Sequence, residues 1–156
     1  MNEIRLLRLL ILIAAAFSWA GPSASALAEE KDPAALARAL QPAKATLEDG
    51  LKASEREGKP ISAKFEIEDG KLQLSVYTAK GDAFSEAVLD PASGAIVKAE
   101  KITDADDLKE AKEQSAAMAK ATPSLATATE AAVKANAGSR AVSAIPEMKP
   151  AIRSRR

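Results

Sequence analysis

The stretch of sequence that decides the fold reads Ile61-Ser-Ala-Lys-Phe-Glu-Ile-Glu68, Asp69-Gly70 and Lys71-Leu-Gln-Leu-Ser-Val-Tyr-Thr78. Asp-Gly between two runs of alternating apolar residues predicts a β-hairpin, because a type I′ turn needs positive φ at both central positions. Pairing Glu68 with Lys71 sets the register. The residues that then meet on one apolar face are Ile67 with Leu72, Phe65 with Leu74, and Ala63 with Val76. The opposite face, which we expect to point outward, carries Lys64, Glu66, Gln73 and Ser75.

A second hairpin and a preceding helix complete the predicted unit. Residues 84–89 and 95–102 alternate around the turn Asp90-Pro-Ala-Ser-Gly94. Apolar residues at spacings of three and four predict a helix over about residues 42–57; they are Leu40, Ala43, Leu47 and Leu51. Gly50 inside it costs up to about 1 kcal/mol relative to Ala, which suggests a close approach to the sheet. Residues 42–102 therefore predict an α+β fold, with an N-terminal helix packed on an antiparallel four-stranded sheet of two hairpins.

The parts on either side of this unit are predicted to be mostly helical. Residues 29–41 form an Ala-rich segment in which Asp32-Pro33 supplies an N-cap and a first-turn proline. Asp104 or the preceding threonine caps a helix to about residue 119, and Thr122-Pro123 opens another to about residue 136. Residues 139–145 begin like a strand, which Pro146 interrupts.

A faint internal repeat connects the two halves of the chain. Gly50-Leu-Lys-Ala-Ser54 is echoed by Ala132-Val-Lys-Ala-Asn136, and Ile61-Ser-Ala63 by Val142-Ser-Ala144. Residues 103–156, with their basic tail, are therefore predicted to be an incomplete second unit. Two interpretations stay open: a degenerate unit that packs on the first, or a unit truncated by an altered reading frame or an early stop. Whether this part folds independently stays open too.

The first 28 residues have the features of a secretory signal peptide. Arg5 and Arg8 precede an apolar run over residues 9–20, and Ala26-Leu27-Ala28 is a small-x-small cleavage pattern, with Ala24-Ser25-Ala26 as the alternative. The run is shorter than the roughly 20 residues of a spanning helix, which favours cleavage over an uncleaved anchor. We therefore expect a periplasmic or secreted protein that has no integral membrane segment after cleavage.

Composition argues against most enzyme classes. The chain has no His and no Cys, which excludes Ser-His-Asp triads, Cys-His dyads and the usual zinc sites within it. It has no glycine-rich nucleotide-binding motif. Removing residues 1–28 leaves 20 of the 22 basic and 21 of the 22 acidic residues, and this net charge of −1 gives no reason to expect nucleic acid as a partner. We expect a protein that is not an enzyme and has no catalytic, cofactor or metal residues.

Several residues suggest function but have a simpler structural interpretation. Ser75 and Lys64 face each other on the outward face, where solvated neighbours are far commoner than Ser-Lys catalysis. Three acidic residues suit the first turn of a helix better than a Ca²⁺ site; they are Asp104, Asp106 and Asp107. Tyr77 projects outward, as an anchor for a partner or as cover for a packed helix. Phe84 is assigned to the core, and the basic tail, Arg153, Arg155 and Arg156, to a solvated end.

A helix ended by glycine and followed by two hairpins, one turning at Asp69-Gly70 and the other at Asp90-Pro-Ala-Ser-Gly94, resembles the PepSY domain family. The resemblance covers about 60 of the 156 residues and is carried by residues 53–58, 61–70, 72–77 and 84–98, of which Val88-Leu-Asp-Pro-Ala-Ser-Gly-Ala-Ile-Val97 is the most similar. The family includes propeptides of thermolysin-type metallopeptidases and free-standing exported proteins, for which a role in peptidase regulation has been proposed. The resemblance therefore implies a small α+β unit, although no peptidase domain follows in this sequence.

These observations favour an exported, non-enzymatic binding module that regulates or inhibits an envelope or secreted peptidase. Strand addition to a partner would use the backbone of residues 84–89 or 95–102, whichever lies at the edge of the sheet. The alternative is a carrier or sensor of a small ligand in the cell envelope, which predicts an apolar pocket between helix and sheet. The oligomeric state and the identity of the partner do not follow from the sequence.

Overall fold

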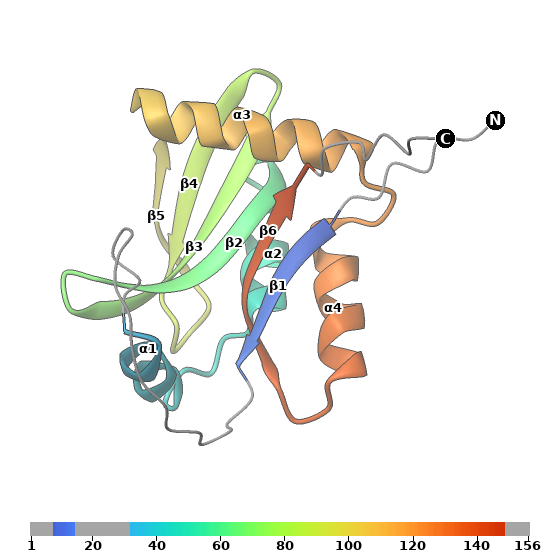
Figure 1. Cartoon of the computed structure of the whole chain (residues 1–156). Helices are drawn as coiled ribbons and strands as arrows, with labels where there is room; N and C mark the ends of the chain where they lie inside the picture. The colour runs from blue at the N-terminus through green and yellow to red at the C-terminus, as the bar shows by residue number, and fades with distance from the viewer. Residues whose placement is uncertain (1–7, 15–31, 149–156) are drawn as a thin grey trace, which may run out of the picture.

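A computed structural model describes the backbone of residues 8–14 and the whole of residues 32–148 (Figure 1). The predicted cleavage sites at residues 24–28 and the basic tail lie outside these ranges. Within the described residues, no helix combines the length and apolar character needed to cross a membrane. Residues 8–14 belong to the predicted leader and form a strand in the full chain; cleavage of the leader stays a prediction.

The fold is α+β, as the sequence predicts, and it is centred on one antiparallel sheet. Its strands are β1 (Arg8–Ala14), β2 (Lys59–Glu68), β3 (Lys71–Lys80), β4 (Ala83–Leu89), β5 (Ile96–Lys101) and β6 (Arg140–Glu147). Their order in space is β1-β6-β2-β3-β4-β5. The strands at the two edges of the sheet are therefore β1 and β5, which are far apart in the sequence (Figure 1).

The first hairpin has the predicted register. β2 and β3 pair Glu68 with Lys71, and every pair expected on the apolar face is found. Asp69 and Gly70 have φ of 49° and 73°, the positive values that a type I′ turn requires. β4 and β5 form the second predicted hairpin. Local alternation and turn chemistry are therefore enough to fix this half of the sheet.

The sheet has more strands than the four that were predicted. β6 pairs with β2 through Ala144 with Ala63 and Ser143 with Lys64, and β1 pairs with the other side of β6. The prediction that Pro146 interrupts this strand is wrong. Pro146 lies opposite Leu9 of β1 but beyond the residues that pair with β2, so the ladder between β2 and β6 needs no N–H from it. The domain boundary placed after residue 102 thus falls between elements of one sheet.

Helices cover both faces of the sheet. They are α1 (Pro33–Leu40), α2 (Leu47–Ser54), α3 (Ala105–Lys120) and α4 (Leu125–Ala135). α2 packs on the apolar face of β2 and β3 with α4 beside it, whereas α3 crosses the opposite face over β6, β2 and β3 (Figure 1). The two helices predicted after residue 102 are therefore present, close to their predicted bounds.

α2 begins at Leu47 rather than near residue 42. Thr46 and Asp49 form a capping box, in which the Asp49 amide donates to Thr46 Oγ1 (3.1 Å) and the Thr46 amide donates to the Asp49 carboxylate (2.9 Å). Leu40 and Ala43 still pack on the core, but from the end of α1 and the turn that follows it. A Cβ at Gly50 would overlap the side chain of Leu74, which confirms the predicted close approach.

α3 covers part of the face that the sequence assigns to solvent. Its Ala111 and Met118 are buried, and Ser62 Oγ of β2 donates to Gln114 Oε1 of α3 at 2.6 Å. Ser75, predicted to point outward, has none of its surface exposed. A helix with a thin apolar side can pack on a polar sheet face when the buried polar groups pair with one another, as Ser62 and Gln114 do.

Arg140, the first residue of β6, connects the last strand to the first turn of the fold. Its guanidinium donates to the carbonyls of Leu40 (2.9 Å) and Ala43 (2.7 Å), and at 3.5 Å to that of Ala45. Its Cζ also lies 6.0 Å from the centre of the Phe65 ring. These carbonyls lie at the end of α1 and in the turn after it, where the backbone carbonyls lack the partners of a continuing helix.

Candidate functional site

The β5 edge is defined as Ile96–Lys101 and the side of its backbone that faces away from β4, and β5 is the most exposed of the strands β2 to β6. β5 pairs with β4, and no strand of the described part of the chain follows it in the sheet order. Only Ile96 is partly buried. Val97 is 65% exposed and so presents apolar surface beside the edge. Of the two strands proposed for strand addition, it is therefore the second that lies at the edge, because β4 lies between β3 and β5.

Backbone amides of β5 point alternately toward β4 and toward the outside. Ile102, directly after β5, donates its amide to the carbonyl of Phe84 at 3.0 Å. Since amides alternate along an antiparallel strand, Lys98 and Glu100 direct theirs to β4, and Ala99 and Lys101 direct theirs outward. The β5 edge therefore presents donors and acceptors to which a further strand can add.

Charged side chains restrict what the β5 edge can pair with. Lys98 Nζ lies 2.8 Å from a carboxylate oxygen of Glu100, and this carboxylate raises the pKa of Lys98. Lys101 adds a second exposed positive charge at the end of the strand. Charges along an edge oppose unspecific pairing between sheets. A partner strand must therefore place complementary charges opposite this row.

The turn before β5 holds the edge in place. The Asp90 carboxylate accepts the amides of Ala92 (3.1 Å) and Ser93 (2.7 Å), and the hydroxyl and amide of Ser93 hold its pKa below the ordinary value. The carbonyl of Pro91 accepts the amides of Lys44 and Ala45, both at 3.0 Å. The β5 edge is thus anchored to the segment ahead of α2.

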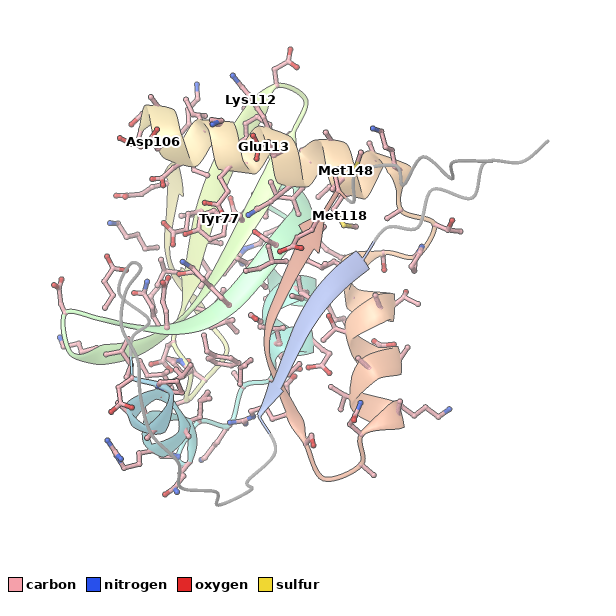
Figure 2. The ribbon with its side chains drawn as sticks, viewed as in Figure 1. Tyr77, Asp106, Lys112, Glu113, Met118 and Met148 are labelled. Carbon is pink, nitrogen blue, oxygen red and sulfur yellow. The ribbon has the colours of Figure 1, made fainter. Side chains whose placement is uncertain are left out.

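A second candidate region lies between α3 and the sheet. A small cavity of about 110 Å³ lies under α3, lined by Lys64, Tyr77, Asp107, Glu110 and Gln114 among others. An open groove of about 750 Å³ continues between α3 and the end of β6. Figure 2 shows Tyr77 on the sheet side of α3, with Glu113 and Met148 at the groove and Lys112 on the far side of the helix. The cavity is lined mainly by polar and charged side chains, whereas the groove also has an apolar side that includes Ile145, Pro146 and Met148.

Glu66 organises the polar face next to this cavity. Its carboxylate accepts from Lys64 Nζ (2.9 Å), Ser75 Oγ (2.8 Å) and Gln73 Nε2 (3.3 Å). Burial alone would raise the pKa of Glu66, but these donors outweigh it and lower the pKa below the ordinary value of 4.5. Lys64 and Ser75 thus both pair with Glu66, so the structure brings together the two residues that were weighed for Ser-Lys catalysis and links them through a carboxylate.

Tyr77 covers a packed helix, which is one of the two interpretations that its outward position allows. It is half-buried beside α3, and Lys64 Nζ lies 5.7 Å from the centre of its ring. Burial, together with the negative charges of Glu86, Glu66 and Asp107, strongly raises the pKa of the Tyr77 hydroxyl. The phenol therefore stays protonated at physiological pH, and its ring serves packing.

The other residues singled out in the sequence have structural roles. Phe84 is buried, as predicted. Asp104 caps α3, because its carboxylate accepts the amides of Asp106 (2.9 Å) and Asp107 (3.2 Å). Two contacts gave no signal in the sequence: the pair Ser62–Gln114 and the contacts of Arg140, which join residues far apart along the chain.

Comparison with known proteins gives no match: no family model, no curated protein and no solved structure is similar to this chain. The likeness to the PepSY domain family therefore stays a resemblance, carried by the turns and strands quoted above.

Proposed function

We propose that this protein is an exported, non-enzymatic binding module that regulates a peptidase by strand addition through the β5 edge. The observation that carries this proposal is the exposed edge strand itself, with outward amides at Ala99 and Lys101 and with Val97 available for contact. A peptidase that holds its substrate as an extended strand offers a complementary edge. A strand added there would block the substrate.

The anchored turn before β5 and the charged side chains of β5 support selective binding. Because Asp90 and Pro91 fix the turn, β5 loses little conformational freedom on binding, which reduces the entropic cost of association. The salt bridge between Lys98 and Glu100 gives the edge a charge pattern that disfavours partners lacking its complement. The predicted leader and the resemblance to the PepSY family favour an envelope or secreted peptidase as the partner.

The second candidate function is transport or sensing of a small ligand in the envelope. The groove of about 750 Å³ beside α3 favours it, since ligand sites commonly measure about 300–1,000 Å³. The enclosed cavity under α3, about 110 Å³, is smaller than such sites. The groove is open, with charged side chains such as Asp106 and Lys109 on one side and apolar ones such as Ile145 and Met148 on the other, which makes it less suitable for a ligand that is apolar throughout.

The decisive experiment compares Ala99→Pro with Ala99→Ser in residues 29–156, tested against a panel of secreted peptidases that includes thermolysin-type metallopeptidases. Proline removes an outward amide and leaves the amides that pair with β4, and serine keeps the outward amide. We expect dose-dependent inhibition by the parent protein and by the serine variant. The proline variant should inhibit at least about tenfold more weakly, because it loses one hydrogen bond to the partner and displaces the neighbouring ones. Equal inhibition by both variants, or rapid cleavage without inhibition, would contradict the proposal; a melting shift with envelope extract would then test for a ligand.

A further inference from the structure

We propose that the β6 edge, the side of Arg140–Glu147 that pairs with β1, is a second strand-binding site. β1 fills it in the full chain, and an extended apolar segment of another exported polypeptide fills it once the leader has been removed. This inference rests on the export and leader cleavage included in the proposed function, but it does not depend on binding to a peptidase.

β1 defines what the β6 edge accepts. It runs antiparallel to β6, from Arg8 opposite Glu147 to Ala14 opposite Arg140, with one irregularity after Leu12. Its sequence, Arg-Leu-Leu-Ile-Leu-Ile-Ala, is apolar at every position after the first. The segment that fits this edge is therefore an extended strand of about seven residues that is apolar on both faces.

β6 itself has the composition of a strand that is paired on both sides. Residues 141–145 carry no charge, and Ala141 and Ala144 are 1% and 0% exposed with β1 in place. The β5 edge, by contrast, carries three charges in six residues. Exposed edges are normally protected by charges, bulges or covering elements. Loss of β1 would expose an uncharged stretch, residues 141–145, between Arg140 at one end of β6 and Pro146 and Glu147 at the other, so the middle of this edge favours a partner strand.

The place of α4 selects a single strand rather than a second copy of the chain. α4 contacts β1 as well as β6, and so reaches past β6 over the position of the added strand. Two copies joined antiparallel through β6 would be related by a two-fold axis perpendicular to the sheet. Each α4 would then cover the β6 strands of both copies on the same face, and the two helices would overlap. An unfolded segment brings no helix into this space.

The test uses the full chain with a site for a specific protease inserted between residues 20 and 21. After cutting, we add a fluorescent peptide of residues 8–14 with two lysines at each end. We expect the peptide to replace the leader with one-to-one stoichiometry, while the amides of residues 141–145 stay protected from hydrogen exchange. The uncut chain should bind the peptide at least about a hundredfold more weakly, because its own strand competes at high effective concentration.

Two N-methylated peptides provide the matched control without changing the protein. One carries methyl groups on the amides of Leu10 and Leu12, and the other on those of Leu9 and Ile11. Alternate amides of an added strand point to the edge, so one peptide should lose at least tenfold in affinity and the other should bind like the parent. Equal affinity of the two, or no entry of the parent peptide after the leader has left, would overturn the inference. Peptide entry without peptidase inhibition would support the strand site on β6 and contradict the proposed peptidase regulation. Inhibition without peptide entry would support peptidase regulation and contradict the strand site.

Discussion

Gly50 lies where α2 comes closest to β3, and the side chain that a substitution would meet, Leu74, is fully buried. Gly50→Ala should therefore destabilise the protein by about 1–3 kcal/mol, because overpacking outweighs the gain in helix propensity of up to about 1 kcal/mol. Urea unfolding measures the difference. The double variant with Leu74→Ala should show coupling that reduces the penalty, whereas stabilisation by Gly50→Ala alone would show that α2 does not pack this closely.

Glu66 gives the stability a dependence on acid pH. Its pKa in the folded state is lowered by Lys64, Ser75 and Gln73 against the opposing effect of burial. A carboxylate with a lowered folded pKa stabilises the fold above its unfolded pKa, near 4.5, and this stabilisation is lost as the pH falls through the folded value. Glu66→Gln should therefore destabilise the protein at pH 7, and the difference from the parent should shrink below about pH 4.

Unfolding midpoints in urea at pH 7, 5 and 3 measure this effect of Glu66→Gln. Glu130→Gln on the exposed side of α4 is the matched control, because it removes the same charge where no contact depends on it. A constant difference between the Glu66→Gln variant and the parent across this range would show that the contacts of Glu66 do not depend on its charge.

At the scale of elements, α3 depends on Asp104, whose carboxylate accepts two backbone amides of the first turn. Asp104→Ala should cost about 1 kcal/mol, the usual loss for an N-cap. Asp104→Asn or Asp104→Ser should recover most of it, because both supply an acceptor. Thermal unfolding of the three variants measures the ranking. Equal loss in all three would point to the charge of Asp104, rather than its role as a cap, as the source.

Elements with local signals could be predicted from the sequence, and contacts between distant elements could not. The register of β2 and β3 follows from alternation and from Asp69-Gly70, and the start of α3 follows from Asp104. The start of α2 was misplaced because the apolar spacing continues back to Leu40, although Thr46 and Asp49 have the spacing of a capping box.

Pairing between β6 and β2 has no such local signal. Residues 140–147 are short and broken in pattern by Pro146, and nothing in their order names β2 as a neighbour. The same holds for the edges: which hairpin strand is exposed depends on the order of all the strands, which placed β5 outside β4. The sequence therefore leaves two strands, β4 and β5, as candidates for strand addition, and the strand order selects β5.

At the scale of the whole molecule, Arg140 connects the last strand, β6, to the segment between α1 and α2. Its guanidinium donates hydrogen bonds to three backbone carbonyls, two of them within 2.9 Å. Arg140→Ala should cost about 2 kcal/mol, and Arg140→Lys should restore less than half, because a single ammonium cannot reach all three carbonyls in the planar geometry of a guanidinium. Urea unfolding measures both. Full recovery with lysine would show that only the positive charge is needed.

The contacts of Arg140 also bear on the order in which the elements can come together during folding. Arg140 lies 100 residues after Leu40, so its contacts with the turn ahead of α2 form only after those that Pro91 makes with the same turn can be in place. Contacts that close so long a loop form late and slow the search for the native state. Docking of the last strand on the segment between α1 and α2 is thus expected to be a late step of folding.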